Sequence, residues 1–99
     1  MIIVAGYLEL DPDQRDGFIA SRRAGMRATR AEPGCLEYAF SPDPVEPGRI
    51  IVLERWATQQ EFEAHIAAAK ARPPKEAAAQ FKAASVFVYS VTGERPLGP

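Results

Sequence analysis

The apolar positions change from a period of two to a period of 3.6 near the start of the chain. Residues 2–10 alternate, yet both alternating sets are largely apolar, which is typical of a strand covered on both faces. Asp11 and Pro12 form a helix start, because Asp caps free amides and Pro fits the first helical position. One face of a helix predicted from about 12 to 31 carries Phe18, Ile19, Met26 and Thr29.

Two strands follow this helix, which Pro33 and Gly34 terminate. The first strand is predicted over 35–40, and its apolar side carries Leu36, Tyr38 and Phe40. Residues 41–48 are rich in proline and end in glycine, so they form a loop between two antiparallel strands. An apolar, β-branched run then predicts the second of these strands over 49–56.

A capping box and an apolar stripe mark the next helix. Thr58 can accept an amide hydrogen bond while the Glu61 side chain reaches back to the cap. The helix is therefore predicted from this cap to about residue 71. Four positions fall on one face of it: Phe62, His65, Ile66 and Ala69.

The C-terminal part of the chain is predicted as a short helix, a strand and a tail. Pro73 and Pro74 end the preceding helix. An Ala-rich helix then runs from about 74 to 83 and buries Ala77, Ala78 and Phe81. The last strand covers 86–92, and residues 94–99 form a loose tail.

The predicted order is β-α-β-β-α-β in a single domain that spans residues 1–99. This order is the split βαβ, or ferredoxin-like, plan of an α+β protein, in which the helices cover one face of a four-stranded antiparallel sheet. The strands carry apolar residues on both faces, so the second face needs a cover of its own. No segment is left for that purpose. We therefore expect a homodimer in which two sheets pack face to face around a twofold axis.

Composition and charge narrow the function classes. The chain of 99 residues has room for one domain. Its formal net charge of -1 shows no basic excess, so nucleic acid is not an expected partner. No apolar run approaches the roughly 20 residues of a membrane span, and the start lacks a signal-peptide pattern. The single Cys35 excludes an internal disulfide and fits the cytoplasm. The acidic residues lack metal-ligand spacing, and no phosphate-binding glycine loop is present.

Two motifs resemble a known family. The first is the run 32–38, read as EPGCLEY, and the second joins Glu54-Arg55-Trp56 through a capped turn to the run 62–66, FEAHI. Together they resemble the antibiotic biosynthesis monooxygenase (ABM) domain, and the likeness extends from the first strand to the last. The resemblance implies a dimeric α+β barrel with a pocket between helices and sheet in each subunit. Members of the family that this chain resembles include oxygenases that act on aromatic polyketides or quinols without a metal or an organic cofactor. The family also has a branch that degrades haem.

The sequence departs from the family pattern at three places. The haem-degrading branch has an Asn where this chain has Gly6, and its haem-ligating His follows the second helix, where this chain is Ala-rich. These differences argue against haem degradation. Many members have a Pro-His pair soon after the helix His, whereas residues 69–74 contain no His. The first helix carries Ser21, Arg22 and Gly25 where many relatives are apolar, which bears on the ligand.

His65 is the single histidine, and histidine exchanges protons near neutral pH. The resemblance implies an oxygenase that takes a proton from a phenol or quinol before the anion reacts with O2. His65 is then the candidate catalytic base, or it hydrogen-bonds the substrate oxygen. The alternative is a structural His bound to a backbone carbonyl. Trp56 is the candidate flat wall against which an aromatic ring stacks, or it packs in the core. The pattern does not decide which face of the sheet Trp56 occupies.

Arg22 is the most distinctive of the substrate-binding candidates. It falls in the middle of an apolar helix face, where it can snorkel, pair with a carboxylate such as Glu54, or line the pocket. In the pocket it would bind a carboxylate or an enolate, and Gly25 would supply space. Tyr38 offers a hydroxyl group or packs on the sheet, and Phe62 completes the candidate substrate-binding set.

We therefore expect a monooxygenase that acts on a small aromatic or quinol-like molecule and O2, without a cofactor or a metal. A non-catalytic small-molecule-binding or stress-related dimer is one alternative, because the same fold hosts both. An isomerase or decarboxylase of a small anionic ring compound is another, and it would suit an Arg22 that faces the pocket.

Overall fold

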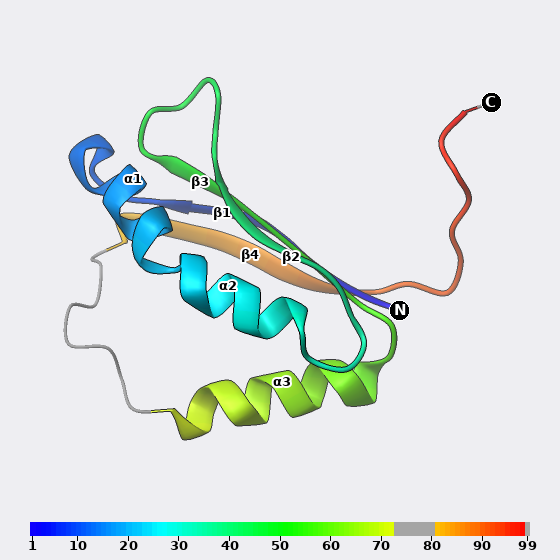
Figure 1. Ribbon diagram of the computed structural model, residues 1–99. Helices are drawn as coiled ribbons and strands as arrows, with labels where there is room; N and C mark the ends of the chain where they lie inside the picture. The colour runs from blue at the N-terminus through cyan, green and yellow to red at the C-terminus, as the bar shows by residue number, and fades with distance from the viewer. Residues whose placement is uncertain (73–80, 99) are drawn as a thin grey trace.

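The computed structural model describes residues 1–72 and 81–98, which form one sheet with the helices on one side of it (Figure 1). Its elements are β1 (Ile2–Glu9), α1 (Pro12–Ser21), α2 (Arg23–Arg30), β2 (Cys35–Pro42), β3 (Arg49–Trp56), α3 (Gln59–Ala71) and β4 (Ala83–Ser90). The strands lie in the order β2-β3-β1-β4, and each neighbouring pair is antiparallel. The predicted α+β, ferredoxin-like plan is confirmed. The Ala-rich helix expected over 74–83 falls mainly on residues outside those described.

Pairing with β1 sets the limits of the last strand. β4 starts at Ala83, opposite Glu9, and ends at Ser90, opposite Ile2. It therefore begins and ends earlier than the strand predicted over 86–92. Ala and Ser carry little strand preference of their own, but cross-strand hydrogen bonds extend β4 as far as its partner reaches.

The helix predicted from 12 to 31 is divided at Arg22 into α1 and α2. The Ser21 hydroxyl donates to the Phe18 carbonyl at 2.6 Å, and the Arg22 amide donates to the Ile19 carbonyl, three residues back, at 3.1 Å. Back-bonding of this kind by Ser bends helices. The Met26 amide still donates to the Arg22 carbonyl at 2.9 Å, so α2 continues from α1 with Arg22 at the corner.

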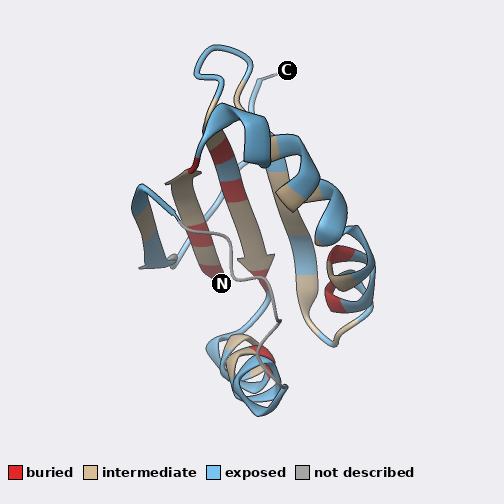
Figure 2. Cartoon of the chain, turned by 90° about the vertical axis from the view of Figure 1, so that its left-hand side faces the viewer, coloured by how far each residue is buried: buried red, intermediate tan, exposed pale blue. Residues whose placement is uncertain are grey.

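The strand register assigns Trp56 to the sheet face that the helices cover. Trp56 lies opposite Ile2 of β1, and its ring stacks on a side chain of α3. The Trp56 side chain is 0% exposed and packs with Ile2 and Val4 in the core. Figure 2 shows the buried residues on the two middle strands and on the sides of the helices that face the sheet.

The opposite sheet face, which we call the open face, carries the alternate residues of the same strands. No helix of the described residues covers it (Figure 1). Its middle is apolar and includes Ile3, Ala5, Ile51, Leu53, Phe87 and Tyr89. Two ion pairs flank this middle, Arg49 with Glu9 at 2.6 Å and Arg55 with Glu37 at 2.7 Å.

Candidate functional site

A histidine–glutamate pair lies between the helices and the sheet. The His65 Nδ1 is 2.7 Å from the Glu32 Oε2, and the His65 side chain is 7% exposed. A carboxylate accepts hydrogen bonds but does not donate them, so the neutral ring carries its proton on Nδ1 and its lone pair on Nε2. The partner of His65 is therefore a carboxylate and not the backbone carbonyl that the structural interpretation of the sequence assumed.

Two turns, one at each side of the pair, bring these side chains together. α3 begins at the Thr58 cap, whose Oγ1 accepts from the Glu61 amide at 3.2 Å, as the capping box predicts. His65 then lies about two turns into α3. Glu32 follows α2, just before Gly34, which has a φ of 79° and accepts at 2.8 Å from an amide in the turn before α3. The turn after α2 is thus held against the turn that starts α3.

The Trp56 indole stacks on the His65 imidazole. The two ring centroids are 4.7 Å apart, and the ring planes differ by 29°. The Trp56 Nε1 donates to the Glu54 Oε1 at 3.1 Å. Burial raises the pKa of Glu54, and the hydrogen bond from Trp56 and the charge of His65 oppose that shift. Glu54 therefore anchors Trp56, whereas the sequence suggested it as a partner for Arg22.

A cavity of about 340 Å³ opens beside the His65–Glu32 pair. Its volume lies in the range of small-molecule sites. The lining comes from α1, α2, α3 and the sheet, and its polar members are Arg22, Thr29, Tyr38, His65 and Arg72. The site therefore combines an apolar enclosure with a few convergent polar groups, which is the usual composition of a ligand pocket.

Aromatic rings form one wall of the cavity. They do not include Trp56, the ring that the sequence suggested for this wall. The wall consists of Phe18, Tyr38, Phe40 and Phe81. Phe18 and Phe81 meet edge to face with centroids 5.4 Å apart. Trp56 and Phe62 are absent from the described lining, and they pack on each other with centroids 6.4 Å apart. Trp56 thus supports His65 from the core side.

Tyr38 brings a hydroxyl group to the cavity. Its ring lies edge-on to the His65 ring, with centroids 5.5 Å apart. Burial, followed by the charges of Glu54 and Glu32, raises the pKa of Tyr38 to about 12. The phenol therefore keeps its proton at neutral pH, where it can donate a hydrogen bond but cannot serve as a base.

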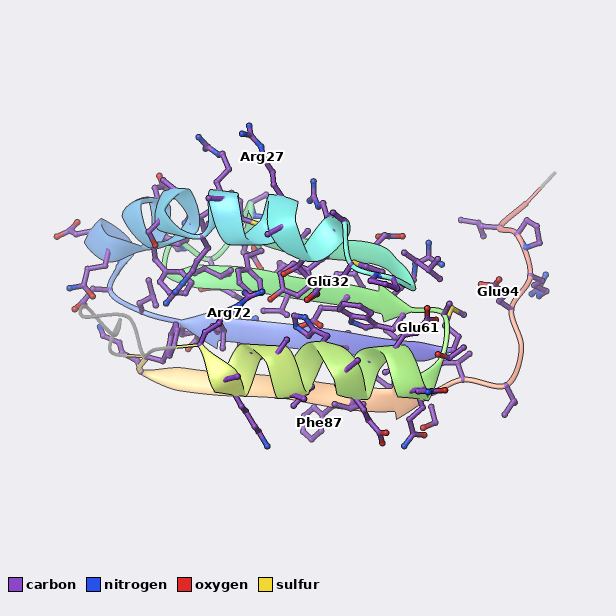
Figure 3. The ribbon with its side chains drawn as sticks, turned by 60° about the horizontal axis from the view of Figure 1, so that its bottom comes forward. Arg27, Glu32, Glu61, Arg72, Phe87 and Glu94 are labelled. Carbon is purple, nitrogen blue, oxygen red and sulfur yellow. The ribbon has the colours of Figure 1, made fainter. Side chains whose placement is uncertain are left out.

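Two arginines also line the cavity. Arg22 lies at the corner between α1 and α2, and its guanidinium carbon is 4.8 Å from the centroid of the Phe18 ring. Arg72 follows the last turn of α3. Figure 3 shows Arg72 and Glu32 in the layer between α3 and the α1–α2 pair. Of the three placements considered for Arg22, the structure shows the one at the pocket.

The structure brings Arg22, Tyr38 and His65 to one cavity, and their roles stay predictions. Sequence reasoning missed Glu32 and Arg72. Glu32 stands in the family-like run EPGCLEY, but its partner is 33 positions away and no local pattern joins the two. Arg72 precedes the proline pair that ends the helix, where an arginine is an ordinary solvated residue.

Two further observations concern metal ligands and the Gly6 position. Across residues 1–72 and 81–98, no three His, Cys, Asp or Glu side chains gather as a metal ion would require. Gly6 lies on the helix-covered face of β1 with a φ of 151°, and a Cβ there would collide with the Ser85 carbonyl oxygen. The position where the haem-degrading branch has Asn therefore has no room for a side chain.

None of the described helices has the length and apolar character needed to cross a membrane.

Sequence comparison matches most of the chain to one family. Residues 1–84 match antibiotic biosynthesis monooxygenase (ABM). The sll1783 protein of Synechocystis sp. is 33% identical over 64 residues, which make up 65% of this chain and 44% of that protein. The chain thus spans less than half the length of this relative.

Solved structures share the fold. A Deinococcus radiodurans protein, described as a candidate antibiotic biosynthesis monooxygenase, aligns over 100% of both chains with a TM-score of 0.76 and 21% identity. The haem degrader MhuD of Mycobacterium tuberculosis, solved with two haems in its active site, aligns over 97% of this chain and 100% of its own with a TM-score of 0.69 and 17% identity. At such identities the likeness concerns the fold alone. With the family match over residues 1–84, the chain belongs to the antibiotic biosynthesis monooxygenase family.

Proposed function

We propose that this protein is a monooxygenase that oxidises a small aromatic or quinol-like molecule with O2 and without a cofactor. The observation that carries the proposal is the 2.7 Å contact between His65 Nδ1 and Glu32 at the cavity lining. A histidine held in one tautomer by a carboxylate offers its other nitrogen as a base. Family membership supports the reaction class, and the aromatic wall supports a flat substrate.

In the proposed reaction, the His65 Nε2 removes a proton from the substrate and leaves an electron-rich anion. Glu32 stabilises the imidazolium that forms. For an anthrone, one oxygen atom of O2 bonds to the methylene carbon, which becomes a carbonyl, and the other leaves as water with the two methylene hydrogens. The substrate supplies all the electrons, so the reaction uses no external reductant. The Tyr38 hydroxyl can donate to the substrate oxygen on which negative charge collects.

Oxygen uptake tests this proposal. A panel of anthrones and hydroquinones, in buffer with a chelator, is expected to give uptake well above the rate without protein. His65→Ala should lower that uptake about 100-fold, in the range of a lost general base. The matched control is Glu63→Gln, because Glu63 is an exposed residue of α3 that accepts from Gln59 at 3.0 Å. Uptake that survives in His65→Ala would remove His65 as the base. No uptake with any compound, together with tight binding of an aromatic acid, would favour the non-catalytic binding protein.

We also propose that two copies pair through the open face. Phe87, Tyr89 and Ile51 are 60%, 51% and 38% exposed on it. Exposed apolar residues gathered on one face are unusual unless a partner covers them. The flanking ion pairs already satisfy the charges at its edges, so the middle can pack against the same middle of a second copy.

A further inference from the structure

We propose that the substrate carries a carboxylate, which Arg22 and Arg72 bind at one end of the cavity while His65 acts at the other. This inference extends the proposed function by naming the substrate class. Its first support is charge, because the described lining contains two guanidinium groups and no carboxylate side chain. Two acids reach this layer, and both are bound within the chain, Glu32 to His65 and Glu54 to Trp56. Guanidinium groups recognise carboxylates by paired, charge-assisted hydrogen bonds.

The second support is the way in which Arg22 is held. It is half-buried, and its guanidinium lies 4.8 Å from the Phe18 ring centroid. Phe18 in turn contacts Phe81 and Phe40, with centroids 5.4 Å and 6.5 Å away. Within residues 1–72 and 81–98, no acid pairs with Arg22 or Arg72. Packing therefore positions the Arg22 guanidinium and leaves its hydrogen-bond donors for a ligand.

The third support is the direction of the two helices. α2 and α3 run antiparallel (Figure 1), so the start of α2 and the end of α3 lie at the same end of the layer. Arg22 and Arg72 belong to that end, whereas Glu32 follows the far end of α2. Arg72 follows His65 by seven residues, a rise of about 10 Å in a helix. The ligand that fits is elongated, with its hydroxyl at His65, its carboxylate at the arginines and its rings along the aromatic wall.

Binding measured without oxygen tests this inference. The probes are 6-hydroxy-2-naphthoic acid and 6-hydroxy-2-naphthamide, which differ only in the charged group, with calorimetry under nitrogen as the readout. The wild-type protein should bind the acid at least about tenfold more tightly than the amide. Arg22→Met and Arg72→Met should each weaken acid binding about tenfold and leave amide binding unchanged. The control is Arg27→Met, since Arg27 lies on the outer side of α2, away from the cavity (Figure 3).

Three results would overturn the inference: equal binding of acid and amide by the wild type, no binding of either, or acid binding that neither arginine variant changes. The comparison of acid with amide uses the wild-type protein, so it does not depend on the folding of a variant. The outcome is also separate from that of oxygen uptake. Acid binding that depends on the arginines, without uptake on any substrate, would keep the carboxylate site and remove the oxygenase.

Discussion

The two faces of the sheet are built from alternate residues of the same strands, but their polar groups are arranged differently. On the helix-covered face, two inward polar groups are paired within the chain: His65 is bound to Glu32, and Trp56 to Glu54. On the open face, charges pair only at the edges, and the middle is apolar and exposed.

The two faces thus differ in where their charges lie and not in their apolar content, and this difference separates the candidate site from the proposed interface. In the part of the chain that the structure describes, no buried side-chain nitrogen or oxygen lacks a hydrogen-bond partner. The fully buried polar groups in that part of the chain are therefore hydrogen-bonded without a second copy. The open face has satisfied its charges and still exposes apolar area, which only another surface can remove from water.

Placing a charge in the middle of the open face is expected to have the largest effect. Ile51→Lys should convert a dimer into monomers, because the twofold axis would bury two uncompensated charges, each costing on the order of 3 kcal/mol. Light scattering at micromolar concentration measures the change. Val45→Lys is the control, since Val45 is 78% exposed in the loop between β2 and β3. A wild-type monomer, or a dimer that survives Ile51→Lys, would contradict the open face as the interface.

Removing the charge of Glu32, on the helix-covered face, should have the next largest effect, which is a loss of oxygen uptake. Glu32→Gln keeps an acceptor oxygen for His65 Nδ1 but no longer stabilises the imidazolium, so oxygen uptake should fall about 10- to 100-fold. The measurement is oxygen uptake with the same anthrones and hydroquinones. Uptake that is unchanged in Glu32→Gln would count against the role of Glu32.

Two glycine variants should give a smaller effect. They distinguish a change in ligand binding at the cavity from a change in helix stability alone. A Cβ at Gly25 or at Gly17 would meet nothing within 4 Å. Each Gly→Ala change should therefore raise the free energy of unfolding by about 0.5–1 kcal/mol through helix propensity. Only Gly25 lines the cavity, so only Gly25→Ala should weaken naphthoate binding, by a few-fold. Equal effects of both variants on binding would argue against ligand entry beside Gly25.

The smallest expected effect concerns Glu54 and pH. Because burial raises the pKa of Glu54 above its ordinary value of 4.5, the unfolded chain releases this proton first as pH rises. The unfolded state then binds fewer protons than the folded state, so Glu54 lowers stability as pH rises through this window. Glu54→Gln keeps an acceptor for Trp56 and removes the titration. Urea denaturation at about pH 4 and about pH 7 should show the variant gaining stability relative to wild type at the higher pH. A pH-independent difference would contradict this assignment.

Local signals in the sequence were enough for most of the fold. The period of two identified the strands, and the Thr58–Glu61 cap marked the start of α3, because these patterns arise within a few residues of one another. The same reasoning placed an arginine on the apolar face of the first helix. It did not find the break at Arg22, which arises because the Ser21 hydroxyl binds the Phe18 carbonyl.

Only the tertiary structure decided how these elements combine into a site. The partner of His65 is 33 positions away, Trp56 lies on the helix-covered face, and Arg72 joins Arg22 at one cavity. Each of these depends on how α2 and α3 cross the sheet, and residues that meet through such packing share no period along the chain. The sequence by itself thus determined the elements, their order and the residue types available for chemistry. Packing between distant segments determined which of those residues face one another.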